Sequence, residues 1–204
     1  MSKLILASLM IIPTGFPQDA DVENPAYARW SGFKPNSWVT FEQPWGRDGV
    51  RQETEKLVRI SKENVVLECA IVENGQPFPV FEKVIPSTIK ANAKNPEYVE
   101  ARRPEGGSVV FDGPGGKTKV SWRTSAEGDE ELKAGGQKLN CHWAKKDHQM
   151  ESAFEAANYK GSVKTWTSKE IPGGVAQLEM TRFLSGDQPQ TIVVTRILKA
   201  WRKE

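Results

Sequence analysis

Three neighbouring side chains, Cys141, His142 and His148, are of the types that bind zinc or act as a nucleophile and its base. A structural zinc site needs four ligands, usually in paired spacings such as Cys-x-x-Cys, and no such pair is present. On a strand, Cys141 and His142 point to opposite faces, which separates a cysteine nucleophile from its base unless His148 folds back. We therefore predict no metal site, no cofactor and no catalytic residue from this group.

A second segment, Asp112–Thr118, ends in Gly-Lys-Thr like the phosphate-binding loop of nucleotide hydrolases. That loop requires a glycine five positions before Gly116, where this chain has Phe111, and a helix that starts at the lysine. Lys117–Trp122 instead has the pattern of a strand. The segment is therefore predicted to be a hairpin turn without affinity for nucleotides.

The two cysteines of the chain, Cys69 and Cys141, are both predicted to point inward. Cys69 shares its parity with Leu67 and Ile71, and Cys141 shares its parity with Leu139. A disulfide between them would close a loop of about 72 residues and contribute roughly 4 kcal/mol in the chain-entropy model. The alternative is two separate buried thiols that behave as small hydrophobic groups. An oxidising compartment favours the disulfide.

Seven tryptophans dominate the aromatic content of the chain. Indole rings bury a large area and carry one N–H donor each, which suits either a β core or the wall of an apolar groove. Four of them lie on predicted strands and are the candidate ligand-binding residues: Trp38, Trp122, Trp143 and Trp166. A groove requires several of the four on one exposed concave face, whereas a core requires them to be sealed.

The elements that must position these residues are mostly strands. Asn64–Glu73 alternates apolar and polar residues, and the following Asn-Gly pair predicts a hairpin that returns through Phe78–Ile85. Asn24 before a proline predicts a short helix over Pro25–Trp30. Further strands are predicted at Ser37–Gln43, Ser108–Phe111, Lys117–Arg123, Glu130–Lys133, Lys138–Ala144, Gly161–Ser168, Gly174–Leu184 and Gln190–Trp201.

Two less regular regions interrupt this pattern. Residues 86–107 are predicted to form a long connection with one helical turn around Pro96–Glu100. Lys145–Asn158 is predicted to form a less regular bridge with helical character at Glu151–Ala157. Little helix is left to connect parallel strands, so an antiparallel sheet is favoured. We predict a mainly β protein with one strongly curved antiparallel sheet of about ten strands, a half-barrel or open barrel, with a short N-terminal helix and one or two small connecting helices.

Composition restricts the partners. The 204 residues include 28 Lys and Arg against 26 Asp and Glu, a formal net charge of +2, and no long basic block. This charge pattern does not predict the basic surface patch that binds nucleic acid. No apolar stretch reaches the roughly 20 residues that a membrane-spanning helix needs. The length is that of one domain of ordinary size.

The first twenty residues resemble an export signal. Lys3 precedes an apolar run from Leu4 to Ile12, followed by a proline and small residues. The alternative is a buried first strand or helix of a cytoplasmic domain. We predict a signal peptide at residues 1–20 and a single β-rich domain at residues 21–204, located in the periplasm or outside the cell.

Several segments resemble uncharacterised exported proteins of planctomycete-type bacteria. The segments that carry the likeness are Trp30–Val39, Gly136–Cys141, Val163–Ser168 and Ile171–Val175, and the likeness covers most of residues 27–184. More remotely, the long antiparallel sheet with a late Trp-x-Ser and a Pro-Gly-Gly turn resembles the lipoprotein-carrier (LolA-like) half-barrel. That resemblance implies a concave apolar face that holds lipid, and it assigns no binding residue to this chain.

Two classes of function remain. The first is a non-catalytic envelope module that binds a lipid or another apolar or amphipathic ligand, with the 86–107 connection as a lid. The second is a hydrolase-type enzyme whose site assembles only in three dimensions. A structural partner in an envelope assembly shares every sequence feature of the first. A binding module without catalytic activity is the favoured prediction.

Overall fold

The structure is a computed structural model, which describes residues 20–46, 48–90, 99–100, 102–113, 116–152, 158–184 and 190–204. Its elements, in chain order, are β1 (Asp21–Glu23), α1 (Pro25–Ser31), β2 (Trp38–Trp45), β3 (Gly49–Ile60), β4 (Asn64–Glu73), β5 (Gln76–Pro77), β6 (Phe81–Pro86), β7 (Thr88–Lys90), β8 (Gly106–Gly113), β9 (Gly116–Ala134), β10 (Gln137–Ser152), β11 (Tyr159–Thr167), β12 (Val175–Leu184) and β13 (Gln190–Arg202).

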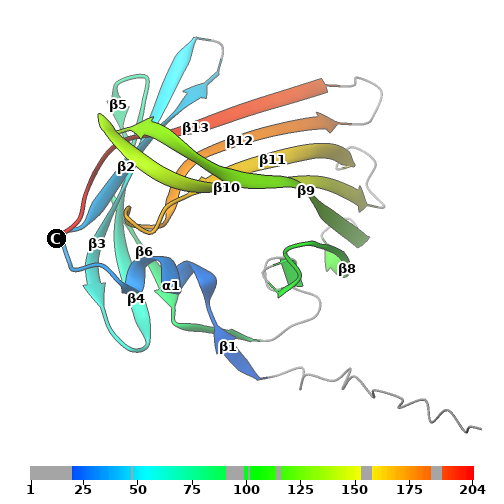
Figure 1. Cartoon of the computed structure of the whole chain (residues 1–204), viewed down its shortest axis with the longest axis horizontal. Coiled ribbons are helices and arrows are strands. Elements are labelled where there is room, and N and C mark those ends of the chain that lie inside the picture. The colour runs from blue at the N-terminus through cyan, green and yellow to red at the C-terminus, as the bar shows by residue number, and fades with distance from the viewer. Residues whose placement is uncertain are drawn as a thin grey trace, which may run out of the picture.

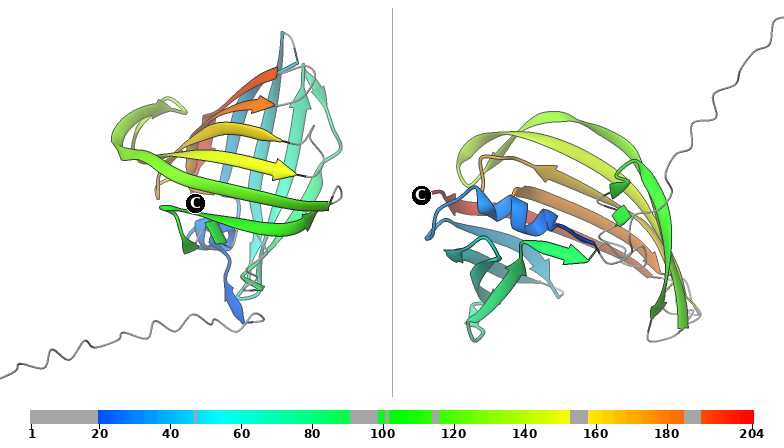
Figure 2. Two further views of the ribbon diagram at one scale, coloured as in Figure 1. Left: turned by 90° about the vertical axis from the view of Figure 1, so that its right-hand side faces the viewer. Right: turned by 90° about the horizontal axis from the view of Figure 1, so that it is seen from below.

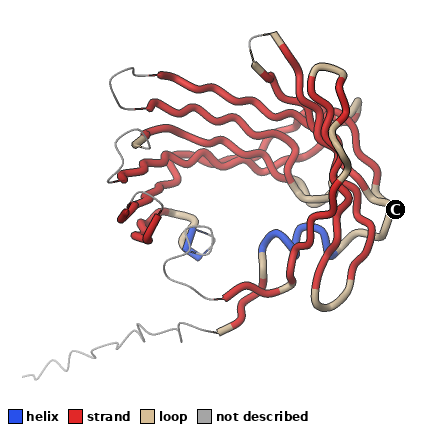
Figure 3. Tube along the Cα trace, turned by 180° about the vertical axis from the view of Figure 1, so that it is seen from behind, coloured by secondary structure: helices blue, strands red, loops and turns tan. Residues whose placement is uncertain are grey.

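One large antiparallel sheet curls into an open half-barrel (Figures 1 and 2). Its strands follow the order β5-β4-β3-β2-β13-β12-β11-β10-β9-β8, with β6 also paired to β4, while β1 and β7 form a separate two-stranded sheet. Strands dominate the trace in Figure 3, and the sheet does not close on itself. The predicted fold class is confirmed.

The turn between β4 and β5 forms as its Asn-Gly pair predicts. Asn74 and Gly75 have φ values of 52° and 80°, and both positive angles suit the tight hairpin turn that twists with its strands. The Asn74 side-chain oxygen also accepts a hydrogen bond of 2.9 Å from the Val50 N–H of the neighbouring β3. The turn therefore ties β3 and β4 together at one end of the half-barrel.

Helix α1 lies inside the curve of the sheet (Figures 1 and 2). Asn24 caps it by accepting a hydrogen bond of 3.0 Å from the Ala26 N–H, and Pro25 occupies the first turn, as predicted. The helix buries Trp30. The core around this ring includes Val39, Phe41, Leu57, Leu67, Cys69, Ile171 and Leu198. We call the side of the sheet that carries Val39 and Leu57 the concave face.

Strands β9 and β10 form a long hairpin that extends beyond β11. They turn at Gly135 and Gly136, with φ values of 56° and 78°. A Cβ at Gly135 would lie 3.0 Å from Trp201 Cδ1, so the turn packs closely against the end of β13. Near the turn, Leu139 and Cys141 join the core. The hairpin thus reaches across from β11 to β13.

Several predicted boundaries differ from the structure. Lys117–Arg123 and Glu130–Lys133 belong to the single strand β9, and the predicted bridge from Lys145 begins as the second half of β10. Strand β3 was not predicted, because the residues it turns to the concave face include charged ones such as Arg51 and Glu53. These charges hide the alternation that identifies a strand.

Other predictions fall partly outside the described residues. The Asp112–Lys117 hairpin is confirmed, since Gly113 and Gly116 are partners at the ends of β8 and β9. Residues 99, 100 and 102 are helical, while 91–98, most of Glu151–Ala157 and the signal peptide up to residue 19 lie outside the described residues. Within the described ranges, no helix is long and apolar enough to cross a membrane.

Candidate functional site

Trp143 and Trp166 lie side by side on β10 and β11, where they are direct partners in register. The Lys164 ammonium lies 4.1 Å from the Trp143 ring centre and 4.2 Å from that of Trp166, a cation–π contact with both rings. The Trp166 N–H donates to the Glu130 carboxylate. Only 4% of Trp166 is exposed. These two rings and Lys164 therefore form one packed cluster.

The other two candidate tryptophans lie elsewhere. Trp38 precedes the fully buried Val39, so alternation places it on the convex face, beside Lys56 in register. Trp122 is buried on β9, opposite His148, and its N–H donates 2.9 Å to the Arg103 carbonyl. The structure thus brings two of the four rings together, and ligand binding by any of them stays a prediction.

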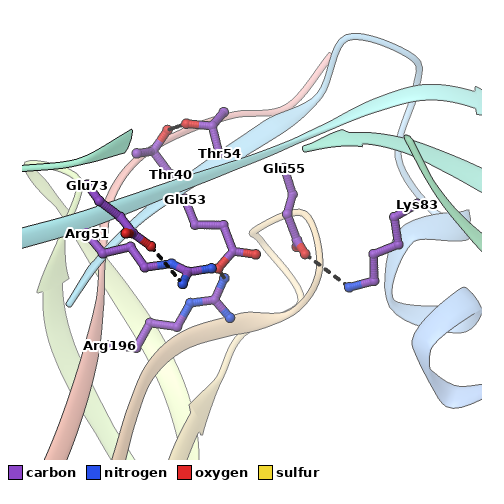
Figure 4. A network of polar contacts seen from close by, with 8 residues as sticks. All are labelled: Thr40, Arg51, Glu53, Thr54, Glu55, Glu73, Lys83 and Arg196. Atoms are coloured by element: carbon purple, nitrogen blue, oxygen red, sulfur yellow. Dashed lines mark hydrogen bonds and ion pairs between the residues drawn. The ribbon is translucent and has the colours of Figure 1, made fainter. Parts of the chain in front are cut away.

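The concave face carries ion pairs that join β3 to β4 and to β13 (Figure 4). Arg51 lies 3.1 Å from the Glu73 carboxylate, and Arg196 lies 3.4 Å from that of Glu53. Arg196 also stacks 3.9 Å from the centre of the buried Phe41 ring. Coulomb attraction and ring contact offset part of the cost of burying these groups. This half of the face is therefore polar but internally neutralised.

The concave face continues from β13 across β12 to β11. Directly opposite residues of antiparallel strands share a face, so the strand register identifies its residues. Leu178 is opposite Arg196, and Met180 is opposite both Val194 and Val163. These apolar side chains are only partly buried, unlike the core around α1. An accessible apolar row therefore continues along the inner side of β11–β13.

Next to this row lie three basic side chains. Lys146 and His148 face inward from β10, and Arg182 faces inward from β12. The Lys146 ammonium is 2.7 Å from the Glu100 carboxylate, so Glu100 lies against β10. Burial lowers the pKa of His148, and the nearby charges of Lys146 and Arg182 lower it further, against the opposing effect of Glu100.

The predicted disulfide is absent. Cys69 and Cys141 are both buried, as their parity predicts, but both are free thiols. Their strands, β4 and β10, are separated in the sheet order by β3, β2, β13, β12 and β11. Inward parity alone does not bring two Cα atoms within the roughly 7 Å that a disulfide needs. Burial raises the pKa of Cys69 to about 11 and also raises that of Cys141.

A cleft of about 690 Å³ lies between α1 and the ends of β10 and β11, and His142 and Ser168 both line it. His142 Nδ1 is 3.0 Å from the exposed Asp129 carboxylate. The neighbouring Thr167 hydroxyl donates 3.2 Å to the His142 carbonyl rather than to its ring, and the Ser168 hydroxyl accepts the Glu170 N–H. These hydroxyl contacts do not assemble a nucleophile with its base.

Among the described residues, no group of three or more His, Cys, Asp or Glu side chains is placed to hold a metal ion. Sequence analysis also missed the charged concave face, since its members come from five strands. The alternation of charged residues along Arg51–Glu55 was the one local signal that pointed to it.

Together these features define an open antiparallel half-barrel with an inner face that is partly apolar and partly charged. Neither a protein-family model nor a curated protein matches the chain. One similar solved structure is a protein proposed to be exported, with a YmcC-like fold, from Bacteroides fragilis. It has a TM-score of 0.44 and 8% identity, and the match covers 84% of this chain and 97% of that one.

Two further solved structures are similar. A proposed lipoprotein from Parabacteroides distasonis has a TM-score of 0.46 and 8% identity, over 83% of this chain and 96% of that one. The hypothetical lipoprotein YmcC from Escherichia coli has a TM-score of 0.37 and 12% identity, over 81% and 84%. The resemblance to planctomycete-type exported proteins and to the LolA-like carrier stays a prediction.

Proposed function

We propose that this chain is an exported envelope protein that binds an amphipathic ligand, without catalysis, on the concave face of its half-barrel. One observation carries the proposal: the partly exposed apolar row of β11–β13 lies beside charged groups on the same face. An apolar surface with a few polar groups at its border is the usual make-up of a small-molecule site. This apolar row lies inside the curve of the sheet, so a ligand bound there would contact the concave face and not the convex face.

The chemistry of the row defines the ligand class. Val163, Leu178, Met180 and Val194 provide aliphatic contacts but no hydrogen-bonding side chain. Apolar burial contributes about 25 cal/mol per Å², so an alkyl chain gains most from this surface. The ion pairs Arg51–Glu73 and Arg196–Glu53 form the polar border at the β2–β4 side. An amphipathic molecule satisfies both kinds of surface at once.

The test uses the nonionic detergent dodecyl maltoside below its critical micelle concentration, with binding followed by isothermal titration calorimetry. Met180→Asp places a charge in the apolar row and is expected to weaken binding at least tenfold. Thr181→Asp, the neighbouring position on the convex face, is the matched control and is expected to leave binding unchanged. Thermal unfolding of both variants checks that they fold.

Two results would contradict the proposal. Equal loss of affinity in Met180→Asp and Thr181→Asp would show that binding does not involve the concave face. No binding by the wild-type chain would instead favour a structural partner in an envelope assembly. That alternative is supported by the exposed apolar side chains Phe183 and Val193, which are 53% and 65% exposed on the convex face.

A further inference from the structure

Arg182 differs from the other two arginines of the concave face that we have described. Arg51 and Arg196 each have a glutamate within ion-pair distance. The Arg182 guanidinium lies 4.8 Å from the centre of the Tyr159 ring, and among the described residues no carboxylate lies within ion-pair distance of it. Arg182 is nevertheless partly buried. A partly desolvated guanidinium without an anion is a place where an anionic ligand gains interaction energy.

The surroundings of Arg182 define the site further. Gly161 lies between Arg182 and His148 in register, so no side chain stands between the two on the concave face. A Cβ at Gly161 would lie 2.0 Å from the Thr181 carbonyl oxygen, so the close approach of β12 requires glycine here. The arginine and the imidazole are therefore two strand spacings apart, roughly 10 Å between their Cα atoms.

We propose that Arg182 and His148 form a head-group site for the carboxylate of a long-chain fatty acid. This inference rests on the proposed function and names its ligand class. The guanidinium donates two parallel hydrogen bonds to the carboxylate, and the imidazole contributes a third polar contact. The alkyl chain follows Val163 and Met180, which are the next inward residues along β11 and β12.

Charge complementarity favours a monoanion. Lys146 is neutralised by Glu100 at 2.7 Å, so its charge is already balanced. Burial lowers the pKa of His148, so the imidazole is neutral near pH 7. One uncompensated positive charge then remains at Arg182, which matches a carboxylate better than a phosphate dianion. The apolar residues on either side, Met180 and Tyr159, suit a single chain that continues from the head group.

The experiment compares dodecanoate with dodecanol, which has the same chain and no charge, in calorimetric titrations of the full chain. The wild type is expected to bind dodecanoate at least tenfold more tightly than dodecanol. A hydrogen bond to a charged group contributes about 1.5 kcal/mol, which corresponds to this factor. Arg182→Gln should abolish this preference and leave dodecanol binding unchanged. Arg123→Gln, an exposed position on the opposite face of β9 from the buried Trp122, is the matched control and should change neither affinity.

A second variant and a salt series guard against loss of structure in Arg182→Gln. Arg182→Lys retains the charge and should keep part of the preference, and added salt should reduce the preference in the wild type. Equal binding of acid and alcohol, or a preference that persists in Arg182→Gln, would overturn the head-group site while leaving the proposed function intact. If dodecanoate, dodecanol and dodecyl maltoside all failed to bind, both the head-group site and the proposed function would be overturned.

Discussion

The packing of α1 against the loop before β12 is most directly tested at Gly173. This glycine has φ of +73° and follows the buried Ile171. A Cβ added there would lie 3.1 Å from Cζ2 and 3.2 Å from Cε2 of Trp30, the ring that α1 buries. Optimal carbon contacts are about 3.5–4.0 Å. Because Trp30 is only 3% exposed, its ring cannot move outward without disturbing the core.

We expect Gly173→Ala to destabilise the fold by two separable effects. An alanine at positive φ costs about 1–2 kcal/mol, and overpacking against Trp30 adds about 1–3 kcal/mol. Gly136→Ala is the matched control, because Gly136 has a nearly equal φ of +78° while a Cβ there meets nothing within 4 Å. The difference between the two variants therefore isolates the contact with Trp30.

The assay is urea unfolding followed by tryptophan fluorescence and far-ultraviolet circular dichroism. Gly173→Ala should lose at least about 1 kcal/mol more than Gly136→Ala, which corresponds to a further drop in Tm of roughly 2–4 °C for a chain of this size. Equal losses in the two variants would refute the proposed packing of α1 under this loop. A larger loss in Gly136→Ala would refute it as well.

Two further predictions follow from the buried titratable groups. Thiol titration of the denatured, unreduced chain should find two free thiols, and the native chain should react slowly because burial raises the pKa of Cys69 to about 11 and also that of Cys141; absence of free thiols after denaturation would contradict the structure. Because the folded pKa of His148 is lowered, the unfolded chain binds its proton first as the pH falls below about 6.5. The free energy of unfolding should therefore decrease in acid, and His148→Gln should reduce that decrease; an unchanged pH profile in the variant would show that His148 is not buried as described.

Local sequence signals predicted the parts of the fold that depend on neighbouring residues. The Asn-Gly pair at Asn74 fixed the β4–β5 turn, and Asn24 with Pro25 fixed the start of α1. Strand Asn64–Glu73 was predicted with its correct bounds because its alternation is regular. The antiparallel arrangement followed from the scarcity of helix, which leaves few connections between parallel strands.

The parts that were missed depend on contacts between distant segments. Alternation assigned Cys69 and Cys141 to the inside, yet sheet order and curvature decide how far apart they lie, and the chain alone does not encode either in a local pattern. The same holds for the four tryptophans, of which only Trp143 and Trp166 meet. Arg182 carried no signal at all, because its significance comes from the absence of a partner carboxylate within the described residues.

The distribution of charge along the concave face also restricts where a ligand lies. On β3 and β13, Glu53 and Arg196 already form an ion pair of 3.4 Å, so an incoming anion would have to displace a carboxylate to reach Arg196. At Arg182, the same type of ligand has no carboxylate of the described residues to displace. Breaking a partly buried pair costs more than filling an unpaired site. A charged head group should therefore lie on β10–β12, and the ion pairs of β3, β4 and β13 should border the apolar row without contacting a charged group of the ligand.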